Sequence, residues 1–303
     1  MTNHWTTADI PDQSDRVAVV TGANSGLGYR VALGLAAAGA EVVLACRDGD
    51  KAESARSSIR ALAPAARVSF IPLDLADLAS VAAFATSFRS THDTLDLLIN
   101  NAGLMAVDES RTVDGFETQL GVNHLGHFAL TAHLLPLITS TPGARIASMS
   151  SLAHWPGRLD LDDLMFDRRH YGRWEAYGQS KLANLLFILE LQRRLRESGS
   201  GAIAVAAHPG VATTNLGSEY VLTNLLMRVT RPFNSGSVAS GALPMLRAAT
   251  DPAVLGGQFY GPRWAFYGHP VVEIPSQRAR DEVVARALWD VSADLTHSAL
   301  LLA

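Results

Sequence analysis

Short apolar runs alternate with longer amphipathic stretches along most of the chain, and this alternation restricts the fold more than any other feature. The apolar runs have the length of buried strands and span residues 17–20, 42–46, 68–72, 95–99, 145–149 and 202–207. The stretches that follow them carry apolar residues at helical spacing and span residues 26–39, 51–63, 76–90, 115–138, 175–198 and 236–249. This alternation predicts an α/β fold, a doubly wound parallel sheet with helices on both faces.

We expect a single domain over residues 1–303, because no Pro- or Ser-rich linker and no internal repeat divides the chain. Hydrophobic residues make up 48% of the sequence, which is enough for a sizeable core at this length. The one cysteine, Cys46, excludes an internal disulfide and a multi-cysteine metal site.

The charge and the apolar runs limit the partners. A formal charge of −4 with scattered basic residues favours neither nucleic acid nor an anionic membrane. No uninterrupted apolar run approaches the ~20 residues of a membrane span. The polar N-terminal residues show no signal-peptide pattern, so we expect a cytoplasmic protein that acts on a small molecule.

Two segments interrupt the alternation, residues 152–174 and residues 211–235. Both follow strands at their carboxyl ends, where open α/β sheets bind ligands. The second segment is mostly apolar, and we expect it to form a mobile lid over a hydrophobic, fairly bulky substrate. The alternative is that its residues pack into the core or into an oligomer interface.

The first predicted strand is followed by TGANSGLG, residues 21–28, in which glycines occupy positions 22, 26 and 28. Gly22 would permit a tight turn, and Gly26 and Gly28 would let backbone and helix approach a diphosphate. The helix that follows would direct its free N–H groups at the anion. The order of strand, glycines and helix predicts a dinucleotide-binding Rossmann fold. An ordinary turn between strand and helix is the alternative.

The end of the second predicted strand bears on the choice of dinucleotide. NAD-binding proteins typically place a carboxylate there to hold the ribose hydroxyls. This chain has Cys46 followed by Arg47, whose guanidinium can bind a 2′-phosphate. NADP is therefore favoured over NAD. Asp48 would weaken this interpretation if it turned inward, and Arg47 could instead be a solvated surface residue.

Lysine is rare in this sequence, and one of its two lysines follows a tyrosine by four residues in YGQSK, residues 177–181. Tyr177 and Lys181 would lie on the same helix face. A phenol titrates near 10, and a neighbouring ammonium would lower that pKa toward the range of a useful acid–base. A compact ammonium suits this position better than the planar guanidinium found at most other basic positions.

Several motifs occur in one order along nearly the whole chain. They are TGANSGLG, LACRD, NNAG, VNHLGHF, SSLAH, YGQSKLANLLF and HPG. The sequence thereby resembles the short-chain dehydrogenase/reductase family. It is most similar to the branch that holds retinol dehydrogenases, WW-domain oxidoreductases and protochlorophyllide reductases.

The resemblance implies four catalytic residues. Tyr177 would be the acid–base at the substrate oxygen, and Lys181 would tune it and hold the nicotinamide ribose. Ser151 would bind the substrate oxygen, with Ser150 as its competitor and a helix cap as the alternative role. Asn123 would support a water chain from Lys181 to solvent.

The resemblance also implies a cofactor site for NADP(H), with NAD(H) less favoured. Asp74 would contact the adenine, and residues 101–103 would pack on the adenosine. The nicotinamide carboxamide would be lined by Pro209, Gly210, Val211 and Thr213. The expected cofactor-binding residues are Gly22, Asn24, Ser25, Gly26, Leu27, Gly28, Arg47, Asp74, Leu75, Asn101, Ala102, Gly103, Tyr177, Lys181, Pro209, Gly210, Val211 and Thr213.

Other polar residues receive no catalytic role. His124, His127, His154 and His208 are interpreted as structural or surface residues. The three carboxylates of Asp160, Asp162 and Asp163 resemble a metal site. A solvated charged loop is the favoured interpretation, and no metal is expected.

Together these features predict an NADP-dependent enzyme that interconverts a carbonyl and an alcohol by hydride transfer. Reduction of a C=C or C=N bond is one alternative, and a non-catalytic NADP-binding sensor is another. Hydrolase, zinc-protease and P-loop motifs do not occur in the sequence. An outer apolar stripe on the helix predicted at 175–198 suggests a possible homo-oligomer.

Overall fold

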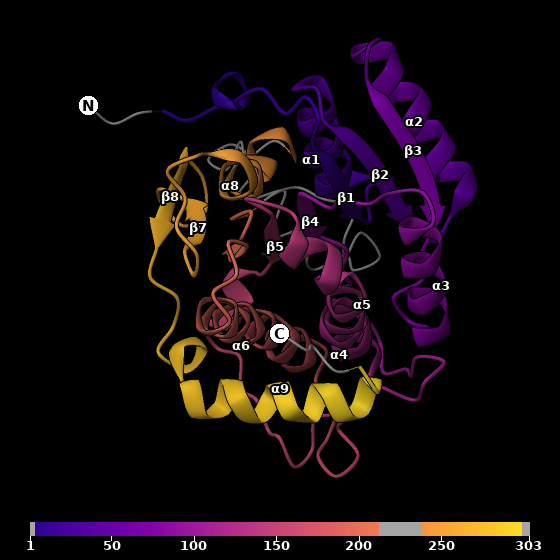
Figure 1. Ribbon diagram of the computed structural model, residues 1–303. Helices are drawn as coiled ribbons and strands as arrows, with labels where there is room; N and C mark the ends of the chain where they lie inside the picture. The colour runs from indigo at the N-terminus through magenta and orange to yellow at the C-terminus, as the bar shows by residue number, and fades with distance from the viewer. Residues whose placement is uncertain (1–3, 212–237, 299–303) are drawn as a thin grey trace.

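The computed structural model describes residues 4–211 and 238–298, and its centre is an eight-stranded sheet (Figure 1). The strand order is β3-β2-β1-β4-β5-β6-β7-β8, and only β8 runs antiparallel to its neighbour. The strands are β1 (Val17–Thr21), β2 (Glu41–Cys46), β3 (Arg67–Pro72), β4 (Leu97–Asn100), β5 (Arg145–Met149), β6 (Ile203–Ala207), β7 (Phe259–Pro262) and β8 (Pro270–Glu273). The first six confirm the apolar runs of the sequence.

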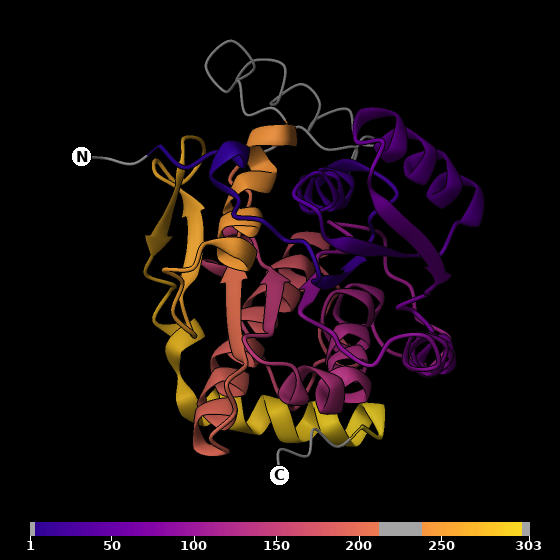
Figure 2. The same cartoon turned by 45° about the horizontal axis from the view of Figure 1, so that its top comes forward.

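Helices cover both faces of the sheet, as Figure 2 shows from a second direction. One face carries α1 (Gly26–Ala37), α2 (Gly49–Leu62) and α8 (Val238–Thr250), and the core beneath them includes Val20, Leu44 and Ile99. The other face carries α3 (Leu78–Arg89), α5 (Gly126–Ser140), α6 (Arg173–Glu197) and α9 (Glu282–Thr296), around Phe84 and Phe128. Both faces of the central strands are thus buried, which is why those strands are continuous apolar runs.

The sheet reverses its winding between β1 and β4. Strands β2 and β3 extend from one side of β1, and β4 pairs with the other side, with Val19 beside both Val43 and Leu98. The chain therefore leaves β1 and β4 toward opposite faces of the sheet, with α1 on one face and α5 on the other. Such a reversal opens the crevice in which doubly wound sheets bind nucleotides.

The helix predicted over residues 115–138 is not continuous. A short helix, α4 (Thr118–Leu120), passes into a π-helical turn, η2 (Gly121–Leu125), before α5 begins at Gly126. Apolar spacing alone does not reveal a change of hydrogen-bond pattern inside one amphipathic stretch. The π-helical turn carries Asn123, and such turns often occur at functional sites.

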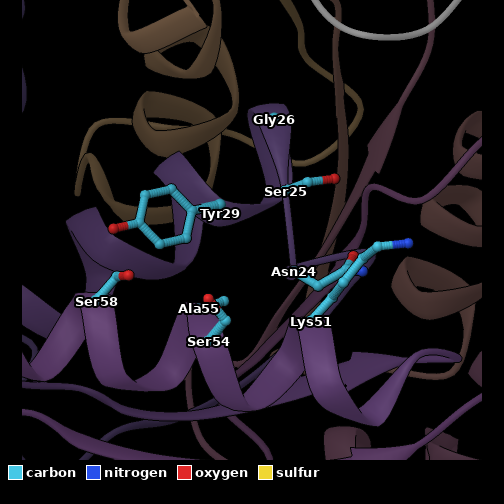
Figure 3. A pocket seen from close by; sticks show the side chains of 8 residues that line it. All are labelled: Asn24, Ser25, Gly26, Tyr29, Lys51, Ser54, Ala55 and Ser58. Atoms are coloured by element: carbon cyan, nitrogen blue, oxygen red, sulfur yellow. The ribbon is translucent and has the colours of Figure 1, made fainter.

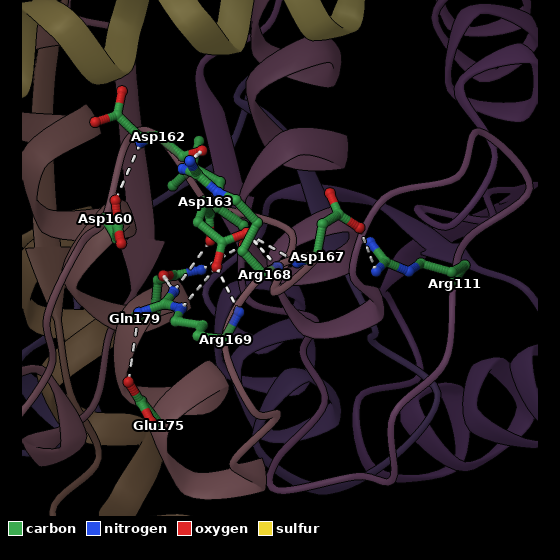
Figure 4. A network of polar contacts seen from close by, with 10 residues as sticks. Arg111, Asp160, Asp162, Asp163, Asp167, Arg168, Arg169, Glu175 and Gln179 are labelled. Carbon is green, nitrogen blue, oxygen red and sulfur yellow. Dashed lines mark hydrogen bonds and ion pairs between the residues drawn. The ribbon is translucent and has the colours of Figure 1, made fainter.

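The segment 152–174 is not simply a solvated loop, which corrects the sequence interpretation (Figure 4). The side chain of Asp163 is buried and accepts hydrogen bonds from the backbone N–H groups of Asp167, Arg168 and Arg169. Arg169 also donates to Gln179 of α6. The buried carboxylate thus organises the loop and ties it to the helix that carries YGQSK, while no cluster of potential metal ligands occurs in the described residues.

The outer face of α6 is covered within the chain. Helix α9 lies across α5 and α6 (Figure 1), where Trp289 packs between Phe128 and Phe187 and beneath Arg194 of α6. Ring centroids are 5.3 Å from Trp289 to Phe128 and 5.9 Å to Phe187. The apolar stripe that suggested an oligomer interface is therefore occupied by the chain's own helix, because apolar area is buried wherever a partner is available.

Neither β7, β8 nor α9 was predicted from the sequence. The expected lid at residues 211–235 lies outside the described residues except for Val211. Among the helices that the structure describes, none has the length and apolar character needed to cross a membrane.

Candidate active site

The glycine-rich turn after β1 has the geometry of a diphosphate cradle. Gly22 and Gly26 have φ of +64° and +57°, a region that favours glycine. A Cβ on Gly28 would lie 2.3 Å from the carbonyl oxygen of Gly22, so only glycine allows the helix to come this close. In the described structure the side chain of Ser25 makes no capping hydrogen bond to α1, which leaves the first N–H groups of this helix available to an anion. Leu27 and Gly28 are buried beneath the cradle.

The loop after β4 is tied to this cradle through Thr21, a residue that the sequence analysis missed. Its hydroxyl oxygen accepts hydrogen bonds from the backbone N–H groups of Asn101 and Ala102, each 2.9 Å away. The amide of Asn101 also donates to the carbonyl of Thr21. A Cβ on Gly22 would lie 3.0 Å from Cα of Ala102. The predicted diphosphate and adenosine loops are therefore one packed unit.

A pocket of about 290 Å³ opens between the cradle and α2 (Figure 3). Its lining residues are Asn24, Ser25, Gly26, Tyr29, Lys51, Ser54, Ala55 and Ser58. The ammonium of Lys51 and the serine hydroxyls make this a site suited to an anion such as a phosphate. Lys51 was not assigned a role from the sequence, although its rarity as one of two lysines was a usable signal.

The residues at the end of β2 are arranged without a carboxylate that faces the cradle. Cys46 is buried, and burial raises the pKa of its thiol to about 11. The side chain of Asp48 turns to cap α2, where it accepts from the N–H of Lys51 and pairs with its ammonium at 2.9 Å. Asp48 therefore does not turn inward. Arg47 is exposed, with its Nη1 atom 3.8 Å from Asp74, the residue predicted to contact the adenine.

Asn123 is fully buried and braces two parts of the site. Its Oδ1 atom accepts from the N–H of Leu104 at 2.7 Å, and its Nδ2 atom donates to the carbonyl of Leu104 and to Ser180 of α6. A Cβ on Gly103 would lie 3.0 Å from this Oδ1 atom and 3.2 Å from Nζ of Lys181. The side-chain amide thus holds the loop after β4 against the helix that carries Lys181. Its predicted support of a water chain stays a prediction.

The two serines after β5 have different environments. Ser150 is buried, and its hydroxyl donates to the carbonyl oxygen of Lys181 at 2.9 Å. Ser151 caps the short helix η3 (Leu152–His154) by accepting from the N–H of Ala153, and its side chain lies near enough to Tyr177 to oppose the rise in the pKa of that phenol. Ser151 is therefore the serine that contacts the tyrosine, and its role as a cap does not prevent this contact.

Tyr177 and Lys181 lie one turn apart on α6, as the spacing predicted. Both side chains are buried, and Nζ of Lys181 lies 5.7 Å from the ring centroid of Tyr177 and 3.3 Å from the carbonyl oxygen of Met149. Burial lowers the pKa of Lys181 to about 8. Burial also raises the pKa of Tyr177, and the interaction with Ser151 opposes this rise without cancelling it. In the protein alone the pKa of Tyr177 is therefore raised and not lowered, because desolvation outweighs the interaction with Ser151.

The loop after β6 faces the same edge of the sheet. Pro209, Gly210 and Val211 are partly exposed there, and Gly210 has a φ of +67°. The N–H of Val211 donates to the carbonyl of Phe266 at 3.0 Å, which joins the loop to the turn between β7 and β8. Thr213 lies outside the described residues. Leu75 is buried behind the loop that carries Asp74, against Gly126.

Two of the four histidines set aside in the sequence analysis have clear structural partners, His127 beside the cradle and His124 against α9. His127 hydrogen-bonds Thr21 at 2.9 Å and the carbonyl of Asn123 at 3.0 Å. His124 hydrogen-bonds Ser292 of α9 at 2.8 Å. Burial lowers the pKa of His127 to about 4 and that of His124 to about 3, so both imidazoles are neutral at pH 7 and serve as structural residues.

Comparison with known proteins agrees with this geometry. The sequence profile described as short chain dehydrogenase matches residues 16–162. Retinol dehydrogenase 12 of Mus musculus is 42% identical over 285 residues, which cover 92% of this chain and 86% of the relative.

Solved structures point the same way. An uncharacterised protein from Mycobacterium paratuberculosis is 45% identical, with a TM-score of 0.84 over 99% of this chain and 100% of that one. The RhlG protein of Pseudomonas aeruginosa, solved as an active-site complex with NADP, is 25% identical, with a TM-score of 0.65 over 82% of this chain and 94% of that one. The chain therefore belongs to the short-chain dehydrogenase family and is an oxidoreductase of alcohols and carbonyls.

Proposed function

We propose that this protein is an NADP-dependent reductase of a carbonyl group on a fairly bulky, hydrophobic small molecule, with Tyr177 as the acid–base. The observation that carries the proposal is the contact of Tyr177 with Ser151 beside the buried Lys181, at the same sheet edge as the glycine cradle. When bound, the nicotinamide cofactor supplies a hydride to the carbonyl carbon.

The protein's own residues would handle the proton and the charge. Ser151 would donate a hydrogen bond to the carbonyl oxygen, and Tyr177 would give its phenolic proton to that oxygen as it becomes an alkoxide. The ammonium of Lys181 would stabilise the phenolate left behind. Because burial raises the pKa of Tyr177, its phenol is protonated at neutral pH and has the proton that the reductive direction requires.

The preference for NADP rests on the end of β2 and the pocket beside it. Arg47 is exposed there, Asp48 is engaged in capping α2, and Lys51 lines the pocket next to Asn24 and Ser25. Two cations and no inward carboxylate suit a 2′-phosphate better than free ribose hydroxyls. The NADP complex of the RhlG protein supports the same choice.

The apolar character of the substrate is supported by aromatic side chains at the mouth of the site. Trp174 packs edge-on to Tyr177 with ring centroids 6.0 Å apart and is 56% exposed. Phe266, which is 51% exposed, lies on the turn that holds Val211. An exposed aromatic ring beside the catalytic phenol offers an apolar surface to a substrate. The name of the relative retinol dehydrogenase 12, which refers to a long apolar alcohol, is consistent with this class.

The test is consumption of NADPH by the purified protein with a panel of carbonyl compounds, from short aldehydes to retinal. We expect turnover that rises with the apolar length of the aldehyde. Tyr177→Phe should lower kcat by about 10²- to 10⁴-fold, because general acid catalysis is lost. A matched control is Tyr171→Phe, since the Tyr171 hydroxyl contacts Glu117 and Val107 and not the site. Turnover that survives in Tyr177→Phe would refute the assigned role.

The same panel separates the alternatives. Conjugated enones that are reduced only at C=C would favour the double-bond reductase. Tight NADPH binding with no turnover of any carbonyl would favour the non-catalytic sensor.

A further inference from the structure

His208 is the residue immediately before the loop predicted to hold the nicotinamide, and both of its ring nitrogens are engaged. Its side chain is fully buried. The Nδ1 atom lies 3.2 Å from the backbone nitrogen of Gly210, and the Nε2 atom lies 2.9 Å from a carboxylate oxygen of Glu273 on β8. A buried imidazole thus connects the loop after β6 to the antiparallel edge strand of the sheet.

These two contacts determine where the imidazole proton lies. The backbone nitrogen of Gly210 can only donate, so Nδ1 of His208 must accept and carries no hydrogen. The proton is therefore on Nε2, where it is donated to the carboxylate of Glu273. Without an acceptor at Nε2, the imidazole could move its proton to Nδ1, and the N–H of Gly210 would then face another donor. Glu273 thus keeps His208 in the form that holds the loop.

Two glycines make this arrangement possible. A Cβ on Gly261 of β7 would lie 2.0 Å from Nε2 of His208 and 2.5 Å from Oε1 of Glu273, so a side chain there would separate the pair. A Cβ on Gly210 would lie 2.5 Å from the carbonyl oxygen of Phe266. The loop is therefore held on one side by His208 and on the other by the turn between β7 and β8.

A second histidine attaches the serine loop to the same part of the chain. Nε2 of His154 accepts from the N–H of Ser276 at 3.3 Å, and its Nδ1 donates to the carbonyl of Ser151 at 2.7 Å. The rings of His154 and His208 both pack on Phe259, with centroids 5.5 Å and 5.2 Å away. The segment 259–276 thus reaches both the substrate side and the nicotinamide side of the site.

We propose that Glu273 and His208 are positioning residues for the nicotinamide half of the cofactor, acting through Gly210 and Val211. This rests on the proposed function, since it assumes that the loop after β6 meets the nicotinamide. A purely structural pair would stabilise the whole protein without distinguishing the two halves of the cofactor. A positioning pair would affect the nicotinamide half and spare the adenosine half.

The experiment compares variants that keep different contacts. In His208→Asn, the side-chain oxygen can replace Nδ1 and still accept from Gly210, whereas the contact with Glu273 is lost. In His208→Gln, the amide can replace Nε2 and still donate to Glu273, whereas Gly210 loses its acceptor. Glu273→Gln keeps an acceptor oxygen, and Glu273→Leu does not. Glu282→Leu, which removes an exposed carboxylate paired with Arg286, is the control.

Two readouts are needed: kcat with a saturating aldehyde, and the Kd values of NADPH and of 2′,5′-ADP, which lacks the nicotinamide. We expect His208→Gln and Glu273→Leu to lose about 10- to 100-fold in kcat, because small displacements of a reacting group are costly. Their affinity for NADPH should fall while their affinity for 2′,5′-ADP stays within about twofold of wild type, which also shows that they fold. His208→Asn and Glu273→Gln should retain most activity.

The proposal is overturned if His208→Gln and Glu273→Leu match wild type, or if they weaken NADPH and 2′,5′-ADP equally. It is also overturned if the conservative variants lose as much as the disruptive ones. A wild-type protein that binds NADPH without turnover would refute the proposed enzyme, yet the ratio of the two Kd values would still decide the role of this pair. A wild-type protein that binds neither nucleotide would refute both.

Discussion

Lys181 is a buried cation, and burying its charge should lower the free energy of unfolding. Replacing it with an uncharged side chain should therefore make the protein more stable. Its side chain is 3% exposed, and burial lowers its pKa from 10.5 to about 8. One unit of pKa difference between folded and unfolded states corresponds to about 1.4 kcal/mol, so the charged amine destabilises the free protein by about 3 kcal/mol at pH 7. Methionine has a similar shape and no charge. Lys181→Met should therefore raise the free energy of unfolding by up to about 3 kcal/mol while abolishing turnover.

The substitution leaves few other groups unsatisfied. The carbonyl oxygen of Met149, which accepts from Lys181 at 3.3 Å, also accepts from Nδ2 of Asn184 at 3.0 Å. It therefore keeps a partner in the variant. A gain in stability with a loss of function is expected where a group serves chemistry at the expense of folding.

The stability difference should depend on pH with a definite sign. Below pH 8 the lysine is protonated in both folded and unfolded chains, so the full cost is present. Between pH 8 and 10.5 the folded chain has released its proton and the unfolded chain has not, so wild-type stability rises with pH relative to the variant. The advantage of Lys181→Met should therefore shrink from about 3 kcal/mol at pH 7 to about 2 kcal/mol at pH 9.

The assay is urea unfolding without cofactor at pH 7 and at pH 9, followed by circular dichroism. Lys51→Met is the matched control, because Lys51 is the other lysine of the sequence and its side chain is 70% exposed. The control should change stability by no more than about 0.5 kcal/mol. A Lys181→Met protein that is less stable than wild type at pH 7, or whose advantage does not change with pH, would refute the reasoning.

Three further predictions concern other parts of the molecule. Trp289→Ala should lower the free energy of unfolding by about 3–5 kcal/mol, because it leaves a cavity against Phe128; an effect below 1 kcal/mol in urea unfolding would mean that α9 is loosely held. Arg47→Glu should raise the KM for NADPH about tenfold or more with little change for NADH, and equal effects on both coenzymes in steady-state assays would contradict the assigned phosphate contact. Asp163→Asn should lower the thermal unfolding midpoint, because one amide oxygen cannot accept three backbone N–H bonds as the carboxylate does; an unchanged melting curve would argue against its organising role.

Local sequence patterns were sufficient to predict most strands and helices of the fold and most residues of the candidate site. Strands β1 to β6 are short apolar runs, and the helices between them follow from apolar spacing, because burial on a sheet face imposes these periods on the chain. The glycine positions, the YGQSK spacing and the order of the motifs placed the cradle, Tyr177 and Lys181 at one edge of the sheet. These features depend on residues that are close together in sequence, or they follow from the rule that parallel strands share a carboxyl edge.

Features that depend on contacts between distant residues could not be predicted in the same way. Strand β7, strand β8 and helix α9 lack a strong local signature. The choice of Ser151 over Ser150 depends on which hydroxyl faces Tyr177, since Ser150 is held by the carbonyl of Lys181. The burial of Asp163 depends on how its loop folds back on Gln179. The raised pKa of Tyr177 is of the same kind, because spacing shows the neighbouring charge and not the loss of water around the phenol.

The contact of His208 with Glu273 shows most clearly the difference between what local sequence predicts and what only the tertiary structure determines. The two residues are 65 positions apart, and neither lies in a pattern that links it to the other. The partner of a buried polar group is whichever residue the packed chain brings within hydrogen-bond distance, and that is known only once β8 has paired with β7. Apolar periodicity shows which faces of a segment are buried. The residues that pack on each face are known only from the assembled sheet.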